Sequence, residues 1–207
     1  MSLSRYKQYW HTILVGFTVL SLLILGACAS QPQQVAEVTK PILTPEETPE
    51  QKQFQTAVSL LKETKVDQAK SLFEKLNKQH SEYIGPLSNL GLIALKQGDL
   101  EQAKFYFRQI FKLNNTNITA LNSLGVIARK EGQFDEAEAF YRQVLALDGS
   151  NQMALRNLGI LLDLYRGHLS EALVLYERYQ GLQTKPDAKM KDWIFDLKSR
   201  INAEARK

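Results

Sequence analysis

Apolar residues recur every three to four positions through most of the chain, which is the pattern of helices that bury one face. Pairs of such segments alternate, and short polar stretches separate them. The pattern predicts an all-α chain built from helix pairs. In the first helix of three consecutive pairs, the predicted core positions are Leu87, Leu90 and Ala94; Leu121, Leu124 and Ala128; and Leu155, Leu158 and Leu162.

The pairs repeat with a period of 34 residues. Ala69, Ala103 and Ala137 are spaced by 34, and Ala172 follows one residue late. The segments around these alanines are alike, as in GDLEQAKFYFRQI and GQFDEAEAFYRQV, and so are the upstream segments NLGLIALKQG and SLGVIARKEG. The chain therefore resembles the tetratricopeptide repeat family, which implies a right-handed superhelix of about four helix-turn-helix units. The resemblance covers residues 51–182, with units at about 51–83, 84–117, 118–151 and 152–182.

Small residues explain how the two helices of a unit pack. Glycine inside a helix costs about 1 kcal/mol relative to alanine, so a recurring mid-helix glycine predicts a close approach of the second helix. Glycine after a helix predicts the turn between the two helices. We expect the aromatic residue of each second helix to fill the space against the next unit. The mid-helix glycines are Gly91, Gly125 and Gly159; the turn glycines are Gly98, Gly132 and Gly167; the aromatic residues are Phe107, Tyr141 and Tyr176.

The two end units differ from the central ones. The first has Ala57 at the mid-helix glycine position and no turn glycine, as expected of a terminal unit with one face toward solvent. The fourth carries one extra residue within Tyr165–His168, which predicts a wider turn between its helices. A final helix over 186–207 is expected to start at Pro186 and Asp187 and to cap the array. Its predicted apolar face is Met190, Trp193, Ile194, Leu197 and Ile201.

The N-terminal residues resemble a bacterial lipoprotein signal. Basic Arg5 and Lys7 precede an apolar stretch, and Leu25-Gly26-Ala27-Cys28 ends it. The resemblance implies that residues 1–27 are a removed signal peptide, and that Cys28 carries a diacylglyceryl group and a further acyl chain such as palmitate. A transmembrane helix is the alternative, but a span needs about 20 apolar residues and this stretch is shorter. An ordinary secretory signal with a chance cysteine is the other alternative.

The residue after Cys28 bears on location. It is Ala29, whereas aspartate at this place retains lipoproteins in the inner membrane of enteric-type bacteria, so we expect an outer-membrane anchor facing the periplasm. Residues 28–50 hold four of the six prolines and are expected to be a flexible linker. Without Arg5 and Lys7 the net charge falls from +4 to +2, and no Lys/Arg tract indicates a nucleic-acid partner.

Catalytic and metal-binding patterns are missing from the sequence. It contains no nucleophile elbow, no phosphate loop and no H-E-x-x-H motif. The three histidines, His11, His80 and His168, have no second ligand at metal spacing, and Cys28 is the one cysteine. We therefore expect no enzyme, no catalytic or metal residues and no cofactor beyond the lipid.

The family resemblance implies that the first helices line a concave groove that binds a peptide or a helix. Equivalent positions give an apolar stripe of Leu92, Val126 and Ile160, and three asparagines suggest a polar ladder beside it. A carboxylate clamp is not expected, because Leu92 and Val126 stand where its second asparagine would fall. The alternative is that some of these residues only pack against neighbouring helices. The remaining predicted groove residues are Asn89, Lys96, Asn122, Arg129, Lys130, Arg156 and Asn157.

The predicted function is a membrane-tethered adaptor that docks envelope proteins. Pilotin-like lipoproteins, which assist type IV pilus or secretin assembly, resemble this chain in combining a lipid anchor with tetratricopeptide repeats, although they commonly carry more of them. The alternative is a scaffold for peptidoglycan hydrolases and synthases.

Overall fold

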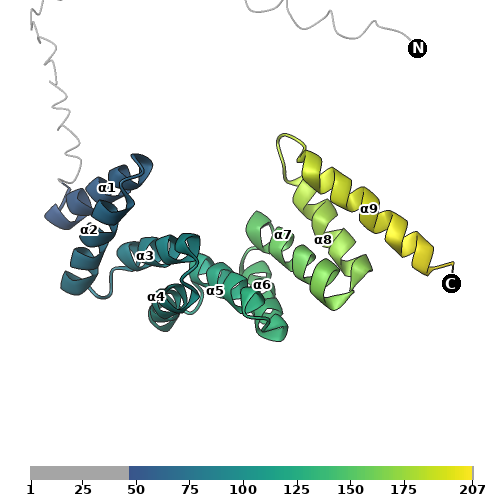
Figure 1. Ribbon diagram of the computed structural model, residues 1–207, viewed down its shortest axis with the longest axis horizontal. Helices are drawn as coiled ribbons and strands as arrows, with labels where there is room; N and C mark the ends of the chain where they lie inside the picture. The colour runs from purple at the N-terminus through teal and green to yellow at the C-terminus, as the bar shows by residue number, and fades with distance from the viewer. Residues whose placement is uncertain (1–46, 207) are drawn as a thin grey trace, which may run out of the picture. The chain divides into compact units, whose positions relative to one another are not determined.

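The computed structural model describes residues 47–206, which form nine α-helices and one π-helix with no strand among them (Figure 1). The predicted signal peptide, Cys28 and most of the linker lie outside the described residues. No helix in the described part is both long and apolar enough to cross a membrane. The helices are α1 (Pro49–Lys62), α2 (Val66–Gln79), α3 (Ile84–Gln97), α4 (Leu100–Leu113), α5 (Ile118–Lys130), α6 (Phe134–Leu147), α7 (Gln152–Leu161), the π-helix η1 (Leu162–Arg166), α8 (Leu169–Gly181) and α9 (Ala188–Glu204).

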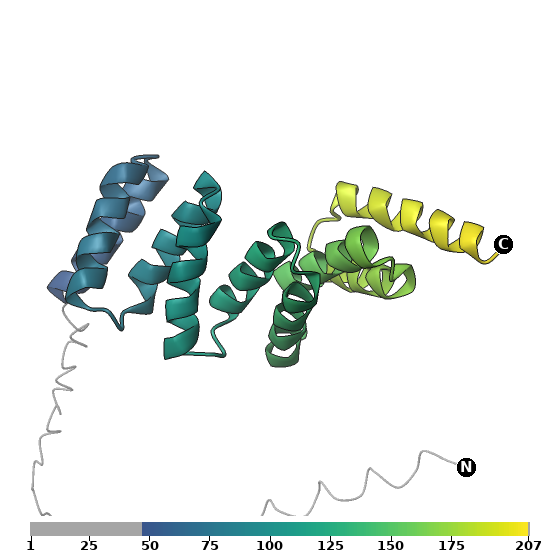
Figure 2. The same ribbon diagram turned by 60° about the horizontal axis from the view of Figure 1, so that its bottom comes forward.

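Successive helices pack against each other in chain order, and hardly any contact skips a neighbour (Figures 1 and 2). This is the arrangement of a repeat array, whose stability comes from each unit and from its interfaces with the next. The all-α array of tetratricopeptide type predicted from the sequence is thereby confirmed. Helix α9 follows the fourth pair and packs on α8, as the capping helix was expected to do.

Polar caps and left-handed turns set the helix boundaries. Asp99, Asn117 and Asn151 each accept a hydrogen bond from the backbone N–H three residues later, which satisfies a free donor of the helix that follows. The predicted turn glycines are confirmed, since their φ angles lie between 69° and 82°. Thr64 occupies the equivalent place in the first unit with φ 62°, a conformation that costs a side-chain-bearing residue free energy.

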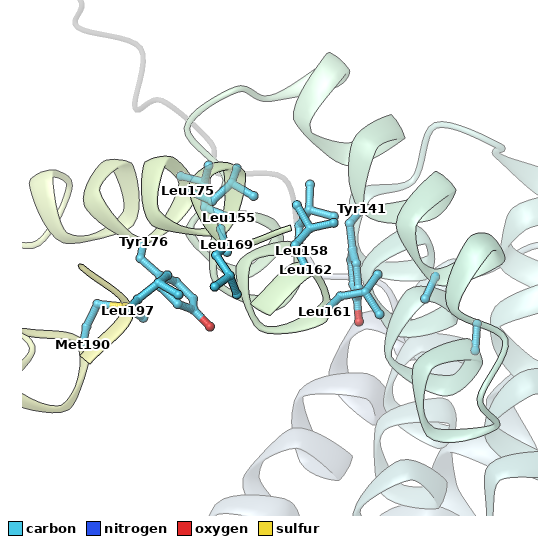
Figure 3. Packing of buried hydrophobic residues seen from close by; sticks show 13 residues of the cluster. Tyr141, Leu155, Leu158, Leu161, Leu162, Leu169, Leu175, Tyr176, Met190 and Leu197 are labelled. Atoms are coloured by element: carbon cyan, nitrogen blue, oxygen red, sulfur yellow. The ribbon is translucent and has the colours of Figure 1, made fainter. Parts of the chain in front are cut away.

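Each mid-helix glycine lies under the aromatic ring of its own unit. A Cβ atom added to Gly125 would stand 2.6 Å from Tyr141, and at Gly91 the corresponding distance to Phe107 is 2.7 Å. The close approach of the second helix is thus confirmed. The same rings also reach the next unit, because Tyr141 shares a buried cluster with Leu155 and Leu158 (Figure 3).

The extra residue of the fourth unit lies inside the helix, and the prediction of a wider turn is wrong. Residues Leu162–Arg166 form a π-helix, in which each turn holds one residue more. The turn that follows keeps the form of the other turns, with Gly167 in the left-handed region. Its closing hydrogen bond runs from His168 N–H to the Leu162 carbonyl at 2.9 Å, six residues back.

The C-terminal helix closes the core as predicted. Asp187 caps it by accepting from the Met190 N–H at 3.2 Å. Met190 and Leu197 are fully buried in one cluster with Tyr176, and Ile194 and Ile201 pack at its edge. Trp193 is 38% exposed, and its ring centre lies 5.9 Å from that of Tyr176. The apolar face of α9 therefore completes the fourth unit (Figure 3).

Candidate partner-binding groove

Three of the predicted groove residues line one open cavity of about 470 Å³, at the junction of the first two units. They are Asn89, Leu92 and Lys96, which lie on successive turns of α3. The end of α1 and the start of α2 supply the other wall. The remaining lining residues are Leu61, Thr64, Val66, Ile93 and Gln97. The cavity combines an apolar floor, an amide and a primary amine, which together suit a peptide side chain and its backbone.

The exposure of the predicted apolar stripe decreases along the array. Leu92, Val126 and Ile160 each follow a mid-helix glycine, so they occupy the same position in successive units. Leu92 is 47% exposed, whereas Val126 and Ile160 are half-buried against the C-terminal core cluster. Leu92 is thus the stripe residue with most surface available to a partner.

The three asparagines do not form a ladder. Asn89 and Asn157 stand two residues before their glycine, but Asn122 stands three before Gly125. Asn122 is 2% exposed, and its amide donates to the side chain of Asn151 at 3.2 Å. Since Asn151 caps α7, Asn122 holds the start of the next unit and does not face a partner. Asn89 donates to the Gly85 carbonyl of its own helix at 2.9 Å.

The predicted positive charges differ in their surroundings. Lys96 and Lys130 are exposed at the ends of α3 and α5. Arg129 is half-buried, with its guanidinium 6.0 Å from the ring centre of Tyr165. Burial raises the pKa of Tyr141, and the neighbouring Arg129 charge opposes that rise. The two lysines are therefore the freer cations, while Arg129 is tied to aromatic neighbours.

The C-terminal end of the groove is occupied by α9. Arg156 is exposed but lies 5.9 Å from the Trp193 ring centre. Asp163, whose side chain is 8% exposed, binds Arg200 at 2.7 Å and accepts from the Tyr176 hydroxyl at 3.4 Å. Burial and the Asp163 charge raise the pKa of Tyr176. Sequence reasoning did not place Asp163 or Arg200 here, because neither stands in the repeated pattern.

Residues 47–206 contain no group of three or more histidine, cysteine, aspartate or glutamate side chains placed to hold a metal ion. Two of the histidines lie at helix boundaries. His80 ends α2, 3.8 Å from Glu50, and His168 precedes α8.

Comparisons with known proteins agree with the geometry. Three family profiles, each described as a tetratricopeptide repeat, match residues 53–83, 86–117 and 118–151. A search among curated proteins found no match. Proteins with such repeats bind peptides and proteins, and their fold typically has no catalytic activity.

Several solved structures share the fold at low sequence identity. MamA (residues 41 to the end) of Desulfovibrio magneticus RS-1 has a TM-score of 0.64 at 17% identity, over 75% of this chain and 87% of that one. PilF of Pseudomonas aeruginosa has a TM-score of 0.64 at 18% identity, over 76% and 72%. YrrB, described as having an unusual peptide-binding site, has a TM-score of 0.54 at 19% identity, over 62% and 66%.

Proposed function

Because this chain is a tetratricopeptide repeat protein, we propose that it is a non-catalytic adaptor, anchored in the outer membrane, which docks envelope proteins in its groove. The observation that carries the proposal is the cavity at the junction of the first two units. There Leu92 offers an exposed apolar surface, and Lys96 stands at the same opening. Apolar surface beside a few polar groups is typical of a binding site.

The anchor follows from the N-terminal sequence. A lipidated Cys28 with two or more acyl chains binds a membrane stably, whereas a single chain binds marginally. The proline-rich segment after Cys28 would let the array stand away from the lipid surface. Helix α1 begins at Pro49, inside the predicted linker, so residues 29–48 separate Cys28 from the first helix. At about 3.1 Å per residue, these residues reach on the order of 60 Å when extended. The argument from Ala29 favours the outer membrane, with the array facing the periplasm.

Within the adaptor class we favour a role in type IV pilus or secretin assembly. The combination of a lipoprotein leader with these repeats supports it, since pilotin-like proteins share both. The likeness to PilF is a likeness of fold, and MamA reaches the same TM-score, so the fold by itself does not choose between partners. The partner has to be identified in cells.

Photocrosslinking from Leu92 in intact cells tests the proposal. The photoreactive residue replaces Leu92, and the adduct is identified by mass spectrometry. Phe105 on α4 is the matched control, because it is apolar and 56% exposed but does not line the cavity. We expect a pilus or secretin component from Leu92 and not from Phe105. A peptidoglycan enzyme would instead make the chain a cell-wall scaffold, and equal adducts from both positions would contradict the groove.

A second experiment tests the anchor by itself. Cys28→Ser removes the thiol that would carry the lipid, so the variant should leave the membrane fraction for the soluble periplasmic fraction. Metabolic labelling with a fatty acid should mark the wild-type protein and not the variant. A variant that still fractionates with membranes would refute lipid anchoring.

A further inference from the structure

Three lysines stand at the same position of successive units. Lys62, Lys96 and Lys130 are spaced by 34 residues and lie in the last turns of α1, α3 and α5. All three are exposed. Residues four apart share one face of a helix, so each lysine lies one turn beyond an apolar residue of the groove position. These apolar partners are Val58, Leu92 and Val126.

The lysine column is not neutralised by nearby carboxylates. The acidic residue next to Lys62 is Glu63, which binds Lys65 at 2.8 Å. The one next to Lys130 is Glu131, which binds Lys104 at 2.7 Å. Lys96 is followed by a glutamine. Among the residues that the structure describes, no aspartate or glutamate carboxylate lies within ion-pair distance of Lys62, Lys96 or Lys130.

Apolar surface accompanies the charge. The Lys96 side chain shares its cavity of about 470 Å³ with Leu92, and with Leu61 and Val66 of the preceding unit. An anionic membrane surface would meet the amine but would leave this recess empty. A peptide segment can fill the recess with one side chain while a neighbouring carboxylate meets the lysine.

The column ends at the fourth unit. By its distance from the mid-helix glycine, Gly159, the fourth position of the column is Leu164. By its distance from the turn glycine, Gly167, it is Tyr165. The two counts differ because the π-helix adds one residue between these glycines. Leu164 and Tyr165 are both exposed. The arginine that follows, Arg166, is bound to Asp135 at 2.8 Å. Leu164 lines a cavity of about 250 Å³ with Trp193, and the charged residues Asp163, Asp196 and Arg200 line it too. The lysine column therefore ends with Lys130.

We propose that the groove takes an acidic segment of a partner protein, with one carboxylate for each of Lys62, Lys96 and Lys130. This inference rests on the adaptor function proposed above and specifies its ligand. A polyproline II strand has three residues per turn and rises about 3.1 Å per residue, so every third side chain falls on one face about 9 Å further on. A segment in this conformation therefore presents its carboxylates on one face, toward the lysine column.

Fluorescence anisotropy of a labelled peptide on the full chain in neutral detergent tests the inference. The probe is four repeats of Glu-Pro-Leu, and the reference peptide has glutamine in place of glutamate. The groove variant combines Lys62→Gln, Lys96→Gln and Lys130→Gln. The matched control combines Lys75→Gln, Lys78→Gln and Lys112→Gln, which removes three exposed charges from the second helices α2 and α4.

One exposed ion pair changes affinity by up to about fivefold, and the proposed complex has one such pair at each column lysine. Since these pairs act together, we expect the glutamate probe to bind at least tenfold more tightly than its glutamine reference. We expect the groove variant to lose about 10- to 100-fold in affinity while the control stays within about twofold. Added salt should weaken the wild-type complex. Circular dichroism should show the same helix content in both variants.

Three results would overturn the inference. They are equal binding of the two peptides, equal losses in the groove and control variants, and lysine-dependent binding to phosphatidylglycerol vesicles without binding to the peptide. Crosslinking from Leu92 in cells distinguishes a failure of the acidic-ligand inference from a failure of the proposed adaptor function. If the groove variant still yields the same adduct, the adaptor function stands and the acidic ligand is wrong.

Discussion

A Cβ atom added to Gly125 would lie 2.6 Å from Cε1 of Tyr141, which is closer than two carbon atoms approach without a bond. The same relationship joins Gly159 to Tyr176 at 2.5 Å. Each of the last three units is thus held by one ring pressed on one bare stretch of helix backbone. The phenol ring of Tyr141 is fully buried and cannot move aside without opening the core.

We predict that Gly125→Ala destabilises the array by about 1–3 kcal/mol, the usual cost of overpacking a tight core. The alanine gains about 1 kcal/mol of helix propensity, so a net loss shows that the contact with Tyr141 outweighs it. Urea unfolding measures the change. Gly181→Ala is the matched control, because nothing lies within 4 Å of the added atom there, and it should be neutral or stabilising. A stabilised Gly125→Ala would contradict the packing.

Thr64→Gly should stabilise the chain by about 1 kcal/mol. Thr64 has a φ of 62°, in the left-handed region where a side chain strains the backbone and glycine does not. The reverse change, Gly98→Thr, places the same strain in the second unit and should destabilise by a similar amount. Both variants can be compared by thermal unfolding. A Thr64→Gly variant that melts below the wild type would show that the entropy of the unfolded glycine chain dominates.

Arg200→Ala should loosen the C-terminal helix. The change leaves the buried Asp163 carboxylate without its cation, which destabilises by about 1–2 kcal/mol once the exposure of Arg200 is allowed for. Hydrogen exchange should rise in α9 and α8 and stay unchanged in α1 and α2. The double variant Arg200→Ala with Asp163→Asn should recover part of the loss, since no buried charge then remains. Uniform exchange across the array would argue against a local role.

Alkaline solution should weaken the fourth unit. Burial, reinforced by the Asp163 charge, raises the pKa of Tyr176 above its ordinary value of 10.0. The folded chain therefore holds this proton more tightly than the unfolded chain. The stabilisation is complete below about pH 10 and is lost as the pH rises toward the folded-state pKa. Tyr176→Phe has no such proton, so its urea midpoint should fall less than that of the wild type between pH 8 and pH 11.

Much of the fold follows from steric patterns that the sequence displays. Glycines and aromatic residues recur at fixed spacing because each unit must bring two helices together in the same way. The groove was harder to predict, because a binding surface requires exposure, which spacing does not reveal. Asn122 shows the difficulty: it stands one position away from its supposed equivalents, and the structure buries it against Asn151. The lysine column keeps the 34-residue period, but only its exposure and its lack of ion pairs distinguish it from other surface lysines.

Long-range polar contacts could not be predicted from the sequence for a different reason. Asp163 and Arg200 lie on different elements, outside the repeated positions, and nothing local pairs them. The location of the extra residue was also ambiguous, because a longer turn and a π-helix lengthen the sequence equally. Only the backbone hydrogen bonds distinguish the two.

The π-helix makes the fourth unit irregular in its count of residues and regular in its contacts. Tyr176 covers Gly159 just as Tyr141 covers Gly125, although one more residue separates them. A search for a fixed period compares positions along the chain, and the matched family ranges here end at residue 151. Units of this kind are better recognised by which ring meets which glycine. Arrays of such helix pairs can then be longer than their sequence periodicity suggests.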